Sequence, residues 1–127
     1  MSWRWISKRG LLILHAESLA EHGGGEGLRD EGLLDSALAR PLNLLAYGDP
    51  DHAALAASYG VGVAKNHPFV DGNKRAALLS VGLFLFLNGW RLVASQAETT
   101  VTMLAVADGS ITEDDFADWL RANTRKK

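Results

Sequence analysis

Hydrophobic residues recur every three or four positions in the first part of the chain, which is the spacing of an amphipathic helix. The repeat begins after Ser7 and runs through about Glu21, and its apolar face consists of Leu11, Leu12, Leu14, His15, Ala16 and Leu19. Serine commonly caps helix starts, and the glycines at positions 23–25 end the repeat. We therefore expect a first helix that packs this face against the remainder of the molecule.

Two more helices are predicted before the middle of the chain. Asp30 can cap a short helix, which Pro41 would stop because proline disfavours a helical conformation in the residue before it. Pro50 follows Asp49 and suits the first position of a third helix that runs to about Lys65. The segment 42–49 between these two helices is short and turn-rich, so we interpret it as a packed connector.

The most apolar segment predicts a buried helix in the centre of the fold. Residues from Asn73 to Asn88 are apolar nearly all round, and Gly89 would close this helix. Residues 90–93 could form a brief extended segment, and Ser95 would start another helix that ends near residues 108–109. Thr112 and Asp115 form an approximate capping box for the last helix. The predicted class is all-α, a compact bundle of about six helices with little or no strand.

Length and composition place the chain among ordinary globular domains. A chain of 127 residues is one domain by length, spanning 1–127, with 47% hydrophobic and 22% charged residues. The net charge is −2, so we expect no direct binding to nucleic acid, and the basic run 125–127 is interpreted as a solvated tail. Cysteine is absent, which excludes disulfides and thiolate metal sites. The apolar run 76–87 is shorter than the ~20 residues that cross a bilayer, so a cytoplasmic protein without membrane contact is expected.

The start of the predicted central helix carries the candidate chemistry. Residues 66–76 combine a histidine, a carboxylate, a glycine and the adjacent cations Lys74 and Arg75. The helix macrodipole disfavours each of these cations by roughly 0.3 to 1 kcal/mol, because a helix start already carries partial positive charge. A phosphate held by the amides of Gly72, Asn73 and Lys74 would compensate them.

A structural interpretation competes with this phosphate site. Asp71 could be the N-cap, and its carboxylate could also pair with Lys74 and Arg75, three and four residues further on, so that no ligand is needed. Helix-start chemistry alone favours this interpretation. His67 shifts the balance toward function, because an imidazole four residues before the cap is more than a cap requires and titrates near neutral pH, as a proton acceptor should.

The same run carries a resemblance to a known family. His67-Pro68-Phe69-Val70-Asp71-Gly72-Asn73-Lys74-Arg75 resembles the signature loop of the Fic/Doc (Fido) family, whose usual form is His-Pro-Phe-x-Asp/Glu-Gly-Asn-Gly-Arg. Lys74 replaces the second glycine, which is the pattern of the Doc branch, the death-on-curing toxins. Segments 21–24, 27–30 and 39–41 also resemble Doc-type chains, so the resemblance covers nearly the whole chain. It implies the Fido fold.

The resemblance also implies a role for each residue of the loop. His67 would accept the proton of the target hydroxyl, and Asp71 would hold Mg²⁺, an ion that commonly takes only one or two protein carboxylates. The ATP phosphates would be bound by Gly72, Asn73, Lys74 and Arg75. The co-substrate and cofactor implied are therefore ATP and Mg²⁺.

Lys74 bears on which reaction the resemblance implies. Typical Fic proteins transfer AMP to a hydroxyl, and their second glycine leaves room for the α and β phosphates. A lysine side chain takes up space there and adds a point charge. The resemblance to Doc-type chains implies that the nucleotide binds reversed and that its γ-phosphate goes to a threonine of elongation factor Tu, which blocks translation. Gly72, where some Doc sequences have alanine, leaves AMP transfer as the alternative. A non-catalytic anion-binding or partner-binding module with a structural His67 is the third possibility.

Further expectations concern control and the remaining aromatic residues. No inhibitory Ser/Thr-x-x-x-Glu-Gly motif is apparent at either end, so the expected partner is a Phd-like antitoxin. Fic proteins present their target chain on a hairpin flap, and the segment 42–49 could be such a flap. His15 and His22 are assigned packing or surface roles, and His52 is expected to be exposed. The tryptophans are interpreted as core or interface anchors.

Overall fold

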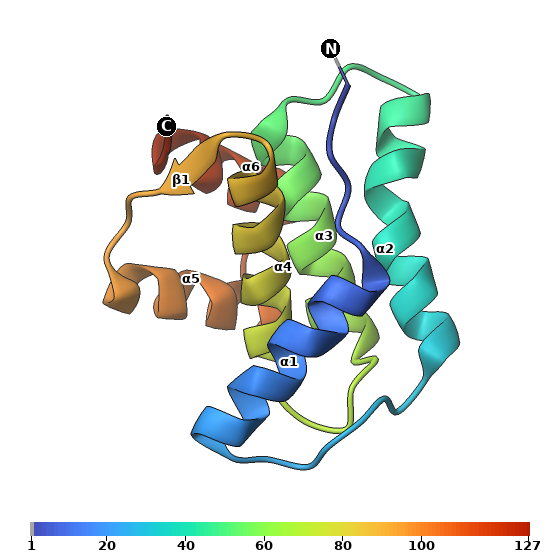
Figure 1. Cartoon of the computed structure of the whole chain (residues 1–127). Helices are drawn as coiled ribbons and strands as arrows, with labels where there is room; N and C mark the ends of the chain where they lie inside the picture. Colours follow the sequence, from blue (N-terminus) through green and yellow to red (C-terminus); the bar gives the residue numbers. More distant parts are fainter. Residues whose placement is uncertain (1) are drawn as a thin grey trace.

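The computed structural model of the chain describes residues 2–127 and places six helices and one small sheet in this range. The elements, in chain order, are α1 Lys8–His22, α2 Glu31–Ala46, α3 His52–Asn66, α4 Asn73–Leu87, β1 Trp90–Leu92, α5 Gln96–Asp108, α6 Glu113–Ala122 and β2 Thr124–Lys126 (Figure 1). The predicted all-α bundle is confirmed. Ser7, Asp30 and Ser95 cap the helices assigned to them, and Thr112 with Asp115 forms the predicted capping box.

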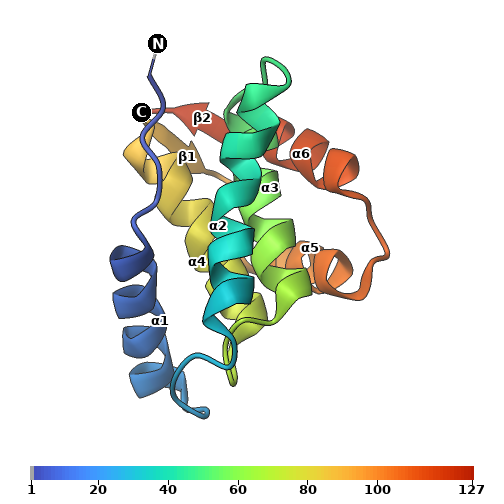
Figure 2. The same cartoon turned by 90° about the vertical axis from the view of Figure 1, so that its right-hand side faces the viewer.

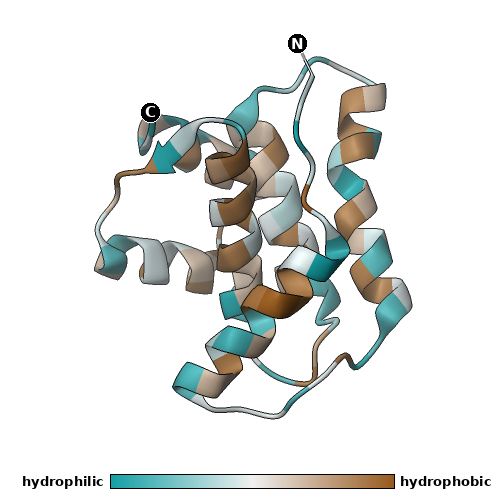
Figure 3. Ribbon diagram, viewed as in Figure 1, coloured by the Kyte–Doolittle hydropathy of each residue, from teal (hydrophilic) through white to brown (hydrophobic). Residues whose placement is uncertain are grey.

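Helix α3 shares the centre of the fold with α4. It packs against α2, α4 and α6, while α1 covers another part of α4. Hydrophobic residues make up most of the ribbon of α4 (Figure 3). However, Phe86 of α4 is exposed, whereas α3 is buried on almost every side. Many of the residues of α3 are small, which permits neighbouring helices to come close. The sequence predicted α3 as a helix but placed α4 alone at the centre of the fold. The alanines and glycines of α3 give a weaker hydrophobic signal than leucines.

Pro41 does not end α2, which contradicts the prediction of a short helix. The helix continues to Ala46, and Pro41 is buried within it together with Leu34 and Ala37. A proline costs helix stability by removing one hydrogen bond, but here the residue is buried in a helix that packs closely against α3. Because residues 42–46 form the last turns of α2, the segment 42–49 is not a strand-like flap.

The start of α3 also differs from the sequence prediction. Asp51 is the N-cap, and its carboxylate accepts the Ala54 amide, so Pro50 precedes the helix and does not open it. His52 was expected to be exposed and is buried. Its ring stacks on Trp90 with centroids 3.5 Å apart, and Nε2 lies 2.9 Å from Oγ1 of Thr124. These two contacts of His52 attach the small sheet to α3.

The chain end forms a strand instead of the predicted solvated tail. β2 pairs antiparallel with β1, with Trp90 opposite Lys126 and Leu92 opposite Thr124. The two terminal lysines lie over aromatic rings, Lys126 over Trp90 and Lys127 over Phe86. The extended conformation predicted for residues 90–93 is confirmed. Its partner strand was missed because a strand of three residues is too short to show an alternating pattern in the sequence.

The N-terminal segment and the C-terminal strand lie at the same end of the molecule. Figures 1 and 2 both show the loop between α3 and α4 at the opposite end. Trp3 and Trp5 pack on Phe84, with ring centroids 5.9 and 6.1 Å away, in agreement with their interpretation as anchors. Within residues 2–127, no helix combines the length and the apolar character that a membrane span requires.

Candidate active site

His67 lies where α3 passes into the candidate loop, residues 67–72. It has left-handed backbone angles, φ 49° and ψ 54°, and is the non-glycine residue with positive φ among residues 2–127. Its amide donates to Val63 O at 3.3 Å and so closes the end of α3. This conformation is uncommon for histidine and turns the chain sharply after the helix. The side chain is exposed, as a group that meets a substrate must be.

Arg29 and its neighbours hold the backbone of the loop from the outside. The Arg29 guanidinium donates to the carbonyls of His67 and Asn66, at 2.8 and 3.1 Å. The amides of Arg29 and Asp30 donate to Pro68 O at 2.7 and 3.0 Å, and segment 27–30 runs antiparallel to residues 68–70. The conformation of the loop therefore depends on a segment about forty positions earlier, whose contact with the loop the sequence did not predict.

His15 supports the loop from beneath. Its buried ring stacks on Phe69 with centroids 3.8 Å apart, and Nε2 lies 2.9 Å from the Asp71 carbonyl oxygen. Because a carbonyl only accepts hydrogen bonds, Nε2 must carry the proton. The packing role expected for His15 is thus observed, and its hydrogen bond fixes the peptide just before α4. A β-carbon on Gly72 would come within 3.3 Å of the same nitrogen, so this turn has room for little more than glycine.

Asn73 links the start of α4 to Phe69 in the middle of the loop. Its Oδ1 accepts the Phe69 amide at 2.9 Å, and its Nδ2 donates to the Phe69 carbonyl at 3.0 Å. Both functional groups of the side chain are therefore used inside the loop. Its contribution to an anion site would come from its backbone amide, which lies in the first turn of α4.

Asp71 does not cap α4, which contradicts the competing structural interpretation. The N-cap is Gly72, with φ 73°, and no side chain accepts the amides of the first turn of α4. The Asp71 carboxylate instead accepts the amides of Gly72 and Gly25, at 2.7 and 3.3 Å. Among residues 2–127, no ion pair includes Lys74 or Arg75. Helix α4 thus begins with first-turn amides that no side chain accepts and with two exposed cations that form no ion pair within residues 2–127, which is an electrostatic setting that suits an anion.

Asp71 is the one carboxylate of the candidate loop that could hold a metal ion. Within residues 2–127, no three histidine, aspartate or glutamate side chains cluster in a way that could hold a metal. Asp71 is exposed at the helix start. A single carboxylate beside a phosphate site suits Mg²⁺, because this ion keeps water and phosphate oxygens as its other ligands.

The residues of the predicted site lie on one loop and on the helix turn that follows it. His67 and Asp71 belong to the loop, and Asn73, Lys74 and Arg75 form the first turn of α4. Sequence reasoning missed Arg29 and the hydrogen bond of His15, which come from the α1–α2 region. A glycine-rich turn followed by an arginine was the available signal, but such a turn alone does not indicate what it contacts.

Comparisons with known proteins assign the chain to a family. Residues 5–85 match the Fic/DOC family, and the chain therefore belongs to that family. The protein kinase doc of Escherichia phage P1 is 36% identical over 119 residues, which cover 93% of this chain and 94% of the phage protein. The toxin Doc of Mycolicibacterium smegmatis is 40% identical over 103 residues, covering 76% of this chain and 78% of the relative. The resemblance to the Doc branch is thereby confirmed.

Proposed function

We propose that this chain is a Doc-type toxin, a protein kinase that transfers the γ-phosphate of ATP to a hydroxyl group of a target protein. The observation that carries the proposal is the start of α4, where no side chain caps the first-turn amides and Lys74 and Arg75 form no ion pair within residues 2–127, beside the exposed imidazole of His67. The name of the phage relative, a protein kinase, supports the same reaction.

In this mechanism His67 is the general base. The target hydroxyl oxygen forms a bond to the γ-phosphorus, and the bond from that phosphorus to the β–γ bridging oxygen breaks, so that ADP leaves. The hydroxyl proton passes to the imidazole. The left-handed conformation of His67 and the hydrogen bonds from Arg29 hold the backbone that carries this base.

The first turn of α4 would bind the phosphates. No side chain accepts the amides of Asn73 and Lys74, and the side chains of Lys74 and Arg75 supply positive charge. The Gly72 amide donates to the Asp71 carboxylate, so Gly72 would contribute by shaping the turn. Asp71 would hold Mg²⁺, which neutralises phosphate charge when it is bound. Hydrogen bonds from Gly25 and Gly72 hold the Asp71 carboxylate in place for this role.

The biological part of the proposal follows the Doc branch. The target would be a threonine of elongation factor Tu, and its modification would block translation in the cytoplasm. The relative called toxin Doc supports control by a cognate antitoxin, and we propose a Phd-like chain whose disordered segment folds over the active site.

AMP transfer to a protein hydroxyl is the second candidate. It is favoured by Gly72, which is the residue of the usual Fic loop at this position, where some Doc sequences have alanine. In that reaction the α-phosphate, and not the γ-phosphate, would have to lie beside His67.

Transfer of radioactive label separates these reactions. The protein is incubated with Mg²⁺, elongation factor Tu and ATP labelled at either the α or the γ position. We expect label on the target only from γ-labelled ATP, and none with the His67→Ala variant. Transfer only from α-labelled ATP would refute the kinase. If cells that produce the His67→Ala variant stopped growing as cells with the unaltered protein do, a non-catalytic module would be indicated.

A further inference from the structure

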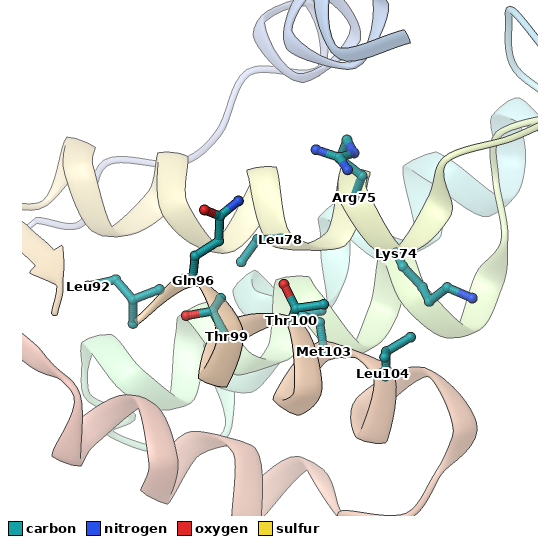
Figure 4. A pocket seen from close by; sticks show the side chains of 9 residues that line it. All are labelled: Lys74, Arg75, Leu78, Leu92, Gln96, Thr99, Thr100, Met103 and Leu104. Atoms are coloured by element: carbon teal, nitrogen blue, oxygen red, sulfur yellow. The ribbon is translucent and has the colours of Figure 1, made fainter. Parts of the chain in front are cut away.

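A pocket with no assigned function lies where the two ends of the chain meet. The groove of about 450 Å³ between α4 and α5 is lined by Lys74 and Arg75, so it adjoins the candidate active site (Figure 4). The pocket at the chain ends has a volume of about 360 Å³ and lies at the other end of α4, beside Leu87 and Asn88. Because α4 has 15 residues, roughly 20 Å separate this pocket from the candidate loop.

Two tryptophan rings form the apolar wall of this pocket, which we call the terminal pocket. It is lined by Ser2, Trp3, Arg4, Leu87, Asn88, Trp90 and Lys126. Trp3 and Trp90 are half-buried. The His52 ring covers one face of Trp90 at a centroid distance of 3.5 Å, so a ligand has access only to the other face. An aromatic wall of this kind suits a ligand with a flat ring.

Positive charge is the main polar feature of the terminal pocket. Arg4 and Lys126 are exposed, no acidic residue lines the pocket, and neither cation forms an ion pair within residues 2–127. The ammonium of Lys126 lies 5.6 Å from the Trp90 ring centroid, so the charge borders the aromatic wall. The Asn88 side chain is already used, because it donates to the Arg4 carbonyl and accepts the Arg4 amide, both at 2.9 Å. A ligand of this pocket should therefore combine a flat ring with negative charge.

The positive charge continues beyond the pocket along the small sheet. Arg91 lies directly opposite Arg125, both are exposed, and neither forms an ion pair within residues 2–127. Like charges in opposite positions destabilise a sheet, so a bound anion would relieve this repulsion. Side chains alternate between the two faces of a strand, which places these arginines on the other face from Trp90 and Lys126. A single small anion cannot contact cations on both faces, whereas a chain of anions that bends around the strands can.

From these features we propose that the terminal pocket binds single-stranded RNA. One base would stack on the tryptophan wall, the phosphates beside it would pair with Arg4 and Lys126, and the following ones would reach the arginines of the sheet. An acidic peptide has the charge but no base to stack, and the bases of a duplex are enclosed within it. The net charge of −2 argued against nucleic acid, but it averages over the chain and does not describe this end. The pocket is remote from His67, so RNA binding here does not depend on the proposed kinase.

Trp3 and Trp5 form a matched pair that tests the stacking. Both rings pack on Phe84, with centroids 5.9 and 6.1 Å away, but Trp3 lines the terminal pocket and Trp5 does not. Fluorescence anisotropy measures the binding of a short labelled single-stranded RNA at low salt. We expect Trp3→Leu to bind about tenfold more weakly than the unaltered protein, since stacking of one base contributes on this scale. Trp5→Leu should bind as the unaltered protein does, and circular dichroism verifies that both variants are folded.

Charge reversal tests the phosphate contacts. Arg4→Glu and Lys126→Glu should weaken binding and make it less dependent on salt, because each phosphate contact with a single strand contributes about −0.7 to the slope of log affinity against log salt concentration. Arg9→Glu is the control, because it changes the net charge equally from an exposed position in α1 that does not line the pocket. Polyglutamate of matched charge and an RNA duplex of the same sequence serve as competitors, and both should compete much more weakly than the unlabelled single strand.

Four results would overturn the RNA assignment. The first is no RNA binding by the unaltered protein at low salt. The second is equal affinity of the folded Trp3→Leu and Trp5→Leu variants, which would leave the aromatic wall without a role. The third is an equal loss in Arg4→Glu and Arg9→Glu, which would assign binding to overall charge. The fourth is competition by polyglutamate or duplex as strong as that by the single strand, which would indicate an acidic protein or a duplex as the ligand. The proposed kinase fails separately, when γ-label is not transferred, whatever the RNA result.

Discussion

At the scale of single residues, the candidate loop owes its conformation to side chains that do not take part in the proposed chemistry. His15 donates to the Asp71 carbonyl and stacks on Phe69, while Asn73 links the start of α4 to the Phe69 backbone. Each of these contacts fixes a backbone group, so that His67 and Asp71 are placed by the peptide framework. Effects on activity are therefore expected from residues that never contact a substrate.

The variant His15→Phe isolates the hydrogen bond from the stacking. A phenylalanine ring can still stack on Phe69 but leaves the Asp71 carbonyl without its donor, which costs about 1–3 kcal/mol of stability. We expect the free energy of unfolding in urea to fall by this amount and kcat for phosphate transfer to fall more than the affinity for ATP. His22→Phe, at an exposed position of the same helix, should change neither quantity. Equal kcat values for His15→Phe and the unaltered protein would contradict the positioning role.

Gly24 and Gly23 form a matched pair that tests the placement of Asp71. Both have positive φ, so alanine at either position costs about 1–3 kcal/mol in backbone strain. A β-carbon on Gly24 would lie 3.0 Å from Oδ2 of Asp71, whereas a β-carbon on Gly23 meets nothing within 4 Å. Gly24→Ala should therefore raise the Mg²⁺ concentration needed for half-maximal transfer, and Gly23→Ala should not. The measurement is the transfer rate as a function of Mg²⁺ concentration, and the same curve for both variants would contradict the prediction.

At the scale of elements, α3 connects the two ends of the molecule. Its last residue is followed by His67, and its first turn holds the small sheet through His52. Its small residues allow α2, α4 and α6 to approach closely, so changes in α3 affect the packing of the whole core.

Added volume within α3 should be costly. A β-carbon on Gly60 would lie 2.8 Å from Cγ2 of Val81 and 3.0 Å from the Phe116 ring, so Gly60→Ala should lower the free energy of unfolding by about 1–3 kcal/mol. Gly82→Ala in α4 is the control, because its β-carbon meets nothing within 4 Å. That change should raise stability by roughly 0.5–1 kcal/mol, since alanine restricts the unfolded chain. Urea denaturation of both variants measures the difference, and a Gly60→Ala variant as stable as the unaltered protein would disprove the close packing.

The contact between α3 and the sheet should weaken in mild acid. Burial lowers the pKa of His52 below its ordinary value of 6.5, although the nearby Asp51 opposes this shift and Arg121 and Lys126 add to it. The unfolded chain therefore binds the proton more readily than the folded chain does. The stability from His52 is complete above pH 6.5 and is lost as the pH falls below that value.

Unfolding measured as a function of pH checks this sign. The Arg121 guanidinium lowers the pKa of Asp51 to about 2, so that ion pair persists through the window in which His52 titrates. His52→Phe can keep the ring on Trp90 but has no proton to gain, and its stability should depend less on pH just below neutrality. An unchanged slope in that variant would assign the pH dependence to another group.

At the scale of the whole molecule, the sequence predicted what is local in the chain. Helices with strong caps or strong periodicity, such as the one that begins after Ser7, were placed correctly, and the signature loop was found because its residues are contiguous. The misses depended on tertiary packing. Pro41 is tolerated because its face is buried, His52 is covered by a strand too short to show periodicity, and Arg29 reaches the loop from a distant segment. Local patterns do not encode such contacts.

The positions of the two chain ends have a practical consequence. The first residues and β2 meet at one pole of the fold, and the loop that carries His67 lies at the other (Figure 2). A fluorophore or a surface tether joined to either end would therefore stand clear of an arriving nucleotide or target protein. Single molecules immobilised in this way would present the loop to the solution, so that capture and release by an antitoxin could be timed directly.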